Sequence, residues 1–99
     1  MANHLYSIVV DYDGGTYISQ EIASSPGEAV QFWSRNISSA GFPSSLTYSE
    51  RIEVQQDMFN CSPVSLDGII NGWCETCVLD SGKMILVHCF KMTSIPHGG

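Results

Sequence analysis

Residues 25–37 read Ser-Pro-Gly-Glu-Ala-Val-Gln-Phe-Trp-Ser-Arg-Asn-Ile, and this stretch decides the fold. Ser25 is typical of a helix N-cap, Pro26 suits the first helical position, and Glu28 completes a capping box. Gly41 ends the segment, because glycine readily adopts the backbone that follows a helix. The sequence therefore predicts a helix over residues 26–39. Its apolar face, expected to pack on a sheet, has side chains at helical spacing: Ala29, Val30, Phe32, Trp33, Ile37 and Ala40.

Upstream of this helix, residues 5–12 and 17–23 predict two strands joined by a hairpin turn at Asp13-Gly14-Gly15-Thr16, because paired glycines adopt positive φ at little cost. A two-residue loop at Gly14-Gly15 places Ile8 opposite Glu21. A longer loop or a bulge places Ile8 opposite Ile22. We favour the second register, because it collects the apolar residues on one face: Tyr6, Ile8, Val10, Tyr12, Ile18 and Ile22.

Downstream of the helix, residues 46–56 predict a strand, because Leu46, Tyr48, Ile52 and Val54 are in phase on one face. Residues 57–72 contain turn signals and one short stretch that could cap a helical turn, so they receive no assignment. Residues 73–79 and 84–92 predict a second hairpin around Asp80-Ser81-Gly82-Lys83. Loops of two and of four residues predict the same pairing of these strands, with Cys74 opposite Cys89 and Glu75 opposite His88.

The predicted order is ββαβ(x)ββ, where x is the unassigned segment. This order indicates a two-layer α+β fold, with a single helix packed on a mostly antiparallel sheet. A chain of 99 residues is expected to form one domain over residues 1–99. Residues 94–99 have no periodicity and are expected to form a disordered tail.

The charge balance excludes two classes of partner. Four Lys and Arg residues stand against ten Asp and Glu residues, so the formal net charge is −6. Neutralising nucleic-acid phosphates or docking on an anionic membrane requires a basic patch, so neither partner is expected. The beginning of the chain lacks the features of a signal peptide, and no apolar run is long enough to span a membrane. We therefore expect a cytoplasmic protein with reduced thiols.

The four cysteines raise a metal or thiol-based hypothesis, with Cys74, Cys77, His88 and Cys89 as its candidate residues. Cys74 and Cys77 form a Cys-x-x-Cys motif, but the residues that follow predict a strand and not the helix of a redox-active dithiol. Along a strand, the odd spacing sends their side chains to opposite faces. Cys74 opposite Cys89 suits either a disulfide or two small buried side chains. No metal and no cofactor are expected.

A small enzyme is the competing class, because Glu75 opposite His88 could pair an acid with a base. The sequence supplies no nucleophile or oxyanion donor that can be placed beside them. We therefore assign no catalytic residues and expect a chain that is not an enzyme.

The stretch from Tyr6 to Ile37 resembles the first part of HicB-type antitoxins, with a strand, an Asp-Gly-Gly turn, a strand and a capped helix that contains Glu-Ala. The resemblance covers about a third of the chain, and the third strand of that family is absent at this point. It implies a sheet with a helix and carries no function.

These features together predict a small non-catalytic interaction or regulatory domain that contacts a protein partner, itself or both, with a homodimer expected. The strand edges carry few cations that would discourage pairing with another chain. The acidic character suits a basic partner.

Overall fold

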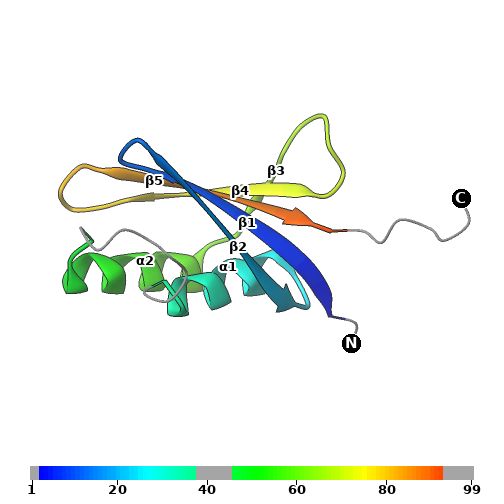
Figure 1. Ribbon diagram of the computed structural model, residues 1–99, viewed down its shortest axis with the longest axis horizontal. Coiled ribbons are helices and arrows are strands. Elements are labelled where there is room, and N and C mark those ends of the chain that lie inside the picture. The colour runs from blue at the N-terminus through cyan, green and yellow to red at the C-terminus, as the bar shows by residue number, and fades with distance from the viewer. Residues whose placement is uncertain (1–2, 38–45, 93–99) are drawn as a thin grey trace, which may run out of the picture.

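The computed structural model describes residues 3–37 and 46–92. The elements in these ranges are β1 (His4–Tyr12), β2 (Gly15–Ala23), α1 (Pro26–Arg35), α2 (Tyr48–Asn60), β3 (Val64–Ser65), β4 (Gly72–Val78) and β5 (Met84–Lys91). The strands form one antiparallel sheet in the order β2-β1-β5-β4-β3, and both helices lie on the same face of it (Figure 1). The α+β class and the antiparallel sheet are thus confirmed. Helix α1 ends at Arg35, with Asn36 as its C-cap, earlier than the predicted end at residue 39. Gly41 and the predicted tail over residues 94–99 lie outside the described residues.

Helix α1 begins as predicted, at Pro26 after the N-cap Ser25. The Ser25 hydroxyl accepts a hydrogen bond from the Glu28 amide at 3.1 Å, while the Glu28 carboxylate reaches one residue further back and accepts from the Ser24 amide at 2.9 Å. The apolar face of α1 packs on the sheet, and Trp33 is 1% exposed. The core therefore forms between this helix and the strands, as the helical spacing predicted.

The prediction of a single helix is wrong, because residues 46–56 contain the start of a second helix and not a strand. Thr47 caps α2, and a complete capping box joins Thr47 to Glu50. Val54 and Met58, one helical turn apart, are fully buried, whereas Tyr48 is 79% exposed. The apparent strand phase was coincidental, since a capping signal and an i, i+4 apolar pair both indicate a helix. The element order is therefore ββααβββ.

Both hairpin registers differ from the predictions. In the first hairpin Tyr12 pairs with Gly15 and Ile8 with Ser19, so the loop is Asp13-Gly14. Asp13 and Gly14 have φ of 50° and 81°, the signature of a two-residue type I′ turn. Neither predicted pairing occurs, although the rejected register had the correct residues on each face. As a consequence Ile18 and Ile22, predicted in the core, lie on the opposite face of the sheet.

In the second hairpin Cys74 pairs with His88, and Glu75 pairs with Val87. The predicted pairings are off by one residue because the loop has three residues. The Leu79 amide donates the hydrogen bond that closes this loop to the Lys83 carbonyl, at 2.9 Å. Gly82 has φ of 90°, which matches a three-residue loop with its last residue in the left-handed region. Loops of two or four residues, the alternatives that the sequence suggested, cannot produce this register.

Candidate functional site

The sheet has one face covered by the helices and one face that neither helix covers, called the open face below. Along each strand, residues alternate between the two faces. Because Ile8, Val10, Val87 and Cys89 are buried under the helices, their neighbours in sequence belong to the open face. Its apolar and aromatic members are Leu5, Val9, Ile18, Ile22, Val64, Cys74, Val78, Met84, Leu86, His88 and Phe90.

A single row of side chains crosses the middle of the open face. The strand registers align Ile18, Val9, His88, Cys74 and Val64, one residue from each of the five strands. At the two ends of the row, Ile18 is 69% exposed and Val64 is 65% exposed. Isolated exposed apolar side chains are ordinary, but contiguous apolar patches on a monomer usually mark an interaction site.

Additional contacts give this row apolar neighbours. The His88 and Phe90 rings stack with centroids 6.5 Å apart and planes at 14°. The loop between β3 and β4 rises on the same side of the sheet (Figure 1). Its residue Ile69 lies so close to Gly72 that a Cβ at that position would collide with the Ile69 side chain. The next residue, Ile70, is 92% exposed, so the loop adds an apolar tip beside the strands.

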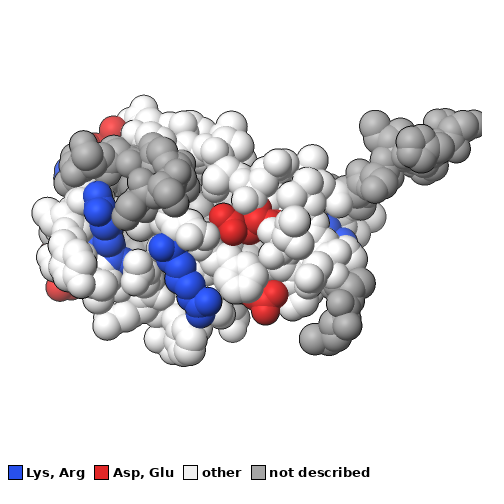
Figure 2. Space-filling model, turned by 60° about the horizontal axis from the view of Figure 1, so that its bottom comes forward, with Lys and Arg blue, Asp and Glu red and all other residues white. Residues whose placement is uncertain are grey.

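Among the strand residues that the structure describes, charge is nearly absent from the open face, and the β3–β4 loop beside it carries Asp67. Glu21, Glu75 and Lys91 lie on strands but point to the helical side. Asp11 is the one charged strand residue on the open face, and its carboxylate accepts a hydrogen bond from the Thr16 hydroxyl at 2.8 Å. The helical side, by contrast, displays Lys and Arg together with Asp and Glu (Figure 2). The acidic chain thus has one face that is close to neutral.

The hollows on the described surface include two of several hundred cubic ångströms. One, of about 320 Å³, lies beside the first hairpin turn and has Asp11, Met84 and Leu86 among its lining residues, so it belongs to the edge of the open face. The other, of about 400 Å³, lies between the helices, and Gln31, Gln55 and Phe59 are among its lining residues. Its lining includes no Asp, Glu, His or Cys, so it lacks a general acid or base.

The residues proposed for a metal or thiol site are divided by the sheet. Cys74 and His88 lie opposite each other on the open face, whereas Cys77 and Cys89 are buried on the helical face. The predicted Cys74–Cys89 pair does not form, and all four cysteines are free. Within residues 3–37 and 46–92, no group of three His, Cys, Asp or Glu side chains could hold a metal ion.

The buried thiols are held in their protonated form. Burial raises the pKa of Cys89 to about 12. Burial also raises the pKa of Cys77 well above its ordinary value, and a hydrogen bond with Asp57 adds to this effect. For Cys61, burial and the nearby Glu75 charge raise the pKa to about 11. Because the thiolate is the nucleophile and the metal ligand, a raised pKa lowers the reactivity of these three thiols.

The sheet also separates Glu75 from His88. Glu75 projects to the helical face opposite Val87, while His88 projects to the open face. A side-chain contact between them would have to pass through the sheet. The acid–base pair suggested by the sequence is therefore not assembled, because the register of the second hairpin is shifted by one residue.

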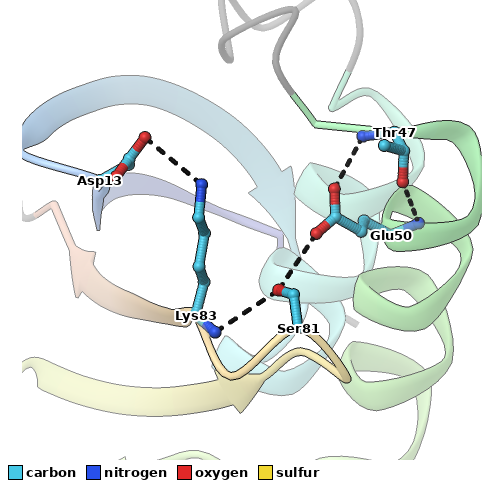
Figure 3. A network of polar contacts seen from close by, with 5 residues as sticks. All are labelled: Asp13, Thr47, Glu50, Ser81 and Lys83. Atoms are coloured by element: carbon cyan, nitrogen blue, oxygen red, sulfur yellow. Dashed lines mark hydrogen bonds and ion pairs between the residues drawn. The ribbon is translucent and has the colours of Figure 1, made fainter.

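A polar network ties the start of α2 to both hairpin turns (Figure 3). The Glu50 carboxylate accepts a hydrogen bond from the Thr47 amide at 2.9 Å and from the Ser81 hydroxyl at 3.4 Å. Lys83, two residues along that turn, lies 3.7 Å from the Asp13 carboxylate. Each contact is exposed and contributes little by itself. Together they connect the turns that bound one end of the open face.

Comparisons with protein-family models, with curated proteins and with solved structures found no match. The described helices include none that is long and apolar enough to cross a membrane. Sequence reasoning placed His88 and Cys74 among its candidates but missed the surface they share. The Asp13-Gly14 pair was the signal that could have revealed it, since a type I′ turn there puts Ile18 and Ile22 on the open face.

Proposed function

We propose that this chain is a non-catalytic interaction domain of the cytoplasm that binds protein surfaces through the open face of its sheet. The observation that carries the proposal is the row of Ile18, Val9, His88, Cys74 and Val64, which crosses the sheet with apolar neighbours and almost no charge. Partner surfaces bury such patches because removing apolar area from water is favourable.

The chemistry of the face also supports binding over catalysis. An enzyme needs convergent polar groups in a pocket that holds a substrate. Here Glu75 and His88 are on opposite faces, and the groove between the helices lacks acids and bases. A thiol-responsive or metal-binding module would need Cys77 and Cys89 to meet Cys74, which the sheet prevents. Four free thiols fit the reducing cytoplasm.

The test compares one variant on the open face with one on the helical side. Ile18 is 69% exposed and Phe59, on α2, is 64% exposed, so Ile18→Glu and Phe59→Glu make the same chemical change at matched exposure. Immobilised wild type and both variants are incubated with extract from the source cells, and retained proteins are quantified by mass spectrometry.

We expect proteins that wild type and Phe59→Glu retain to be lost with Ile18→Glu, because a buried unpaired carboxylate is costly at an interface. Equal retention by wild type and Ile18→Glu would contradict the proposal. The proposal would also be contradicted if wild type retained no protein from the extract, not even another copy of this chain.

A further inference from the structure

We infer that a second copy of this chain occupies the open face, so that two sheets pack face to face in a symmetric dimer. The inference rests on the proposed function and names its partner. It predicts that the face buried in the dimer is the same on both copies, since a two-fold axis brings identical surfaces together.

Charge selects this face for contact between two copies. Each copy carries a formal net charge of −6, so two copies repel each other when their charged surfaces approach. Glu28, Glu50, Glu53 and Asp57 all belong to the helices. Among the described strand residues of the open face, Asp11 is the one that carries a charge, and its carboxylate accepts a hydrogen bond from the Thr16 hydroxyl. Two acidic copies can therefore approach closely over the neutral face.

The size of the face is sufficient for a weak, specific dimer. Strands β1, β2, β4 and β5 have 9, 9, 7 and 8 residues. With a rise of about 3.3 Å per residue and a strand spacing of about 4.8 Å, the four strands span roughly 500 Å² on each copy. Pairing two copies then buries about 1,000 Å² in total, near the lower limit of specific interfaces. An interface at this limit is typical of weak, transient contacts.

The centre of the face is suited to a two-fold axis. The four long strands are ordered β2-β1-β5-β4, so their midpoint lies between β1 and β5. In the central row this midpoint falls between Val9 and His88. Sheets that pack face to face lie about 10 Å apart with interdigitating side chains. Leu86 and Ile18, on either side of this centre, would be buried in such a pair.

Sedimentation velocity in reducing buffer tests the dimer, over protein concentrations from about 1 µM to about 300 µM, which bracket a weak interface of this size. The samples are wild type, Ile18→Glu, Leu86→Glu and the control Phe59→Glu, with circular dichroism as the check of folding. Wild type and Phe59→Glu are expected to shift from monomer to dimer with concentration. Ile18→Glu and Leu86→Glu are expected to remain monomeric at the highest concentration.

A second measurement needs no variant. Cys74 is the one cysteine on the open face, so its alkylation by iodoacetamide in wild type should slow at least several-fold from the lowest to the highest concentration. Wild type that stays monomeric, or a dimer that forms equally well with Ile18→Glu and Leu86→Glu, would overturn the inference. If wild type stays monomeric while Ile18→Glu still loses partners in the extract experiment, the proposed function stands and the self-pairing falls.

Discussion

Val9 and His88 lie directly opposite each other on β1 and β5, and both side chains project from the face of the sheet that neither helix covers. Their sequence neighbours, Val10 and Val87, also pair but are fully buried under the helices. The strand pair at the centre of the fold therefore has a closed core on one side and an accessible apolar row on the other.

The capping box of α2 can be tested with Thr47→Ala. The Thr47 hydroxyl accepts from the Glu50 amide at 3.1 Å, and losing an N-cap of this kind costs about 1 kcal/mol. We expect the free energy of unfolding, measured with urea, to fall by about this amount. Thr47→Ser keeps the hydroxyl and should be close to wild type. Equal stability of the Ala and Ser variants would argue against a helix that begins at Tyr48.

The three-residue turn of the second hairpin can be tested with Gly82→Ala. Gly82 has φ of 90°, where a side chain is strained, so we expect a loss of about 1 kcal/mol or more in thermal or urea unfolding. Gly27→Ala is the matched control, because a Cβ there meets only the Pro63 Cδ at 3.8 Å and the position is helical. A Gly82→Ala variant as stable as the Gly27→Ala variant would contradict the observed register.

The cysteines should differ sharply in reactivity. Burial raises the pKa of Cys61 to about 11 and that of Cys89 to about 12, and it also raises the pKa of Cys77. In dilute native protein we expect Cys74 to be alkylated first, as peptide mapping would show, and all four thiols to react after denaturation. Rapid modification of Cys77 in the native state would show that the seam between α2 and β4 is open.

Burial of Glu21 predicts a pH-dependent stability. Burial raises the pKa of the Glu21 carboxyl above 4.5, so the charged form is disfavoured in the folded state. This group therefore lowers stability above its folded pKa, and the loss is recovered as the pH falls toward 4.5. Glu21→Gln should be more stable than wild type at pH 7, by less than about 1 kcal/mol because solvent screens this partly exposed side chain. The difference should vanish below pH 4.5 in unfolding curves, and a constant difference would contradict this assignment.

The sequence predicted the parts of the fold that depend on strong local signals. Ser25 and Pro26 mark the start of α1, and the spacing of Val30 and Trp33 identified its buried face. The prediction of a strand over residues 46–56 was wrong because Leu46, Ile52 and Val54 fit a strand phase as well as a helical one. The capping pair Thr47 and Glu50 and the i, i+4 pair Val54 and Met58 are the features that favour the helix.

The candidate surface could not be predicted because it depends on two loop lengths. Asp13 adopts positive φ, which is uncommon for a residue with a side chain, so the first loop falls one position earlier than the paired glycines suggest. A shift of one residue in a strand pair reverses which side chains face the core. The favoured register of the first hairpin, with Ile8 opposite Ile22, differs by an odd number of positions from the observed pairing of Ile8 with Ser19, so it placed Ile18 in the core. In the second hairpin a shift of one residue separates His88 from Glu75.

The most direct test of the open face as the surface on which two copies of this chain pair is a comparison of ¹H–¹⁵N spectra of labelled protein at low and high concentration. The account predicts that concentration-dependent shifts and line broadening concentrate on the strands, at Val9, Ile18, Leu86 and His88, while α1 and α2 change little. Shifts that concentrate on the helices, or spectra that are identical at both concentrations, would contradict it.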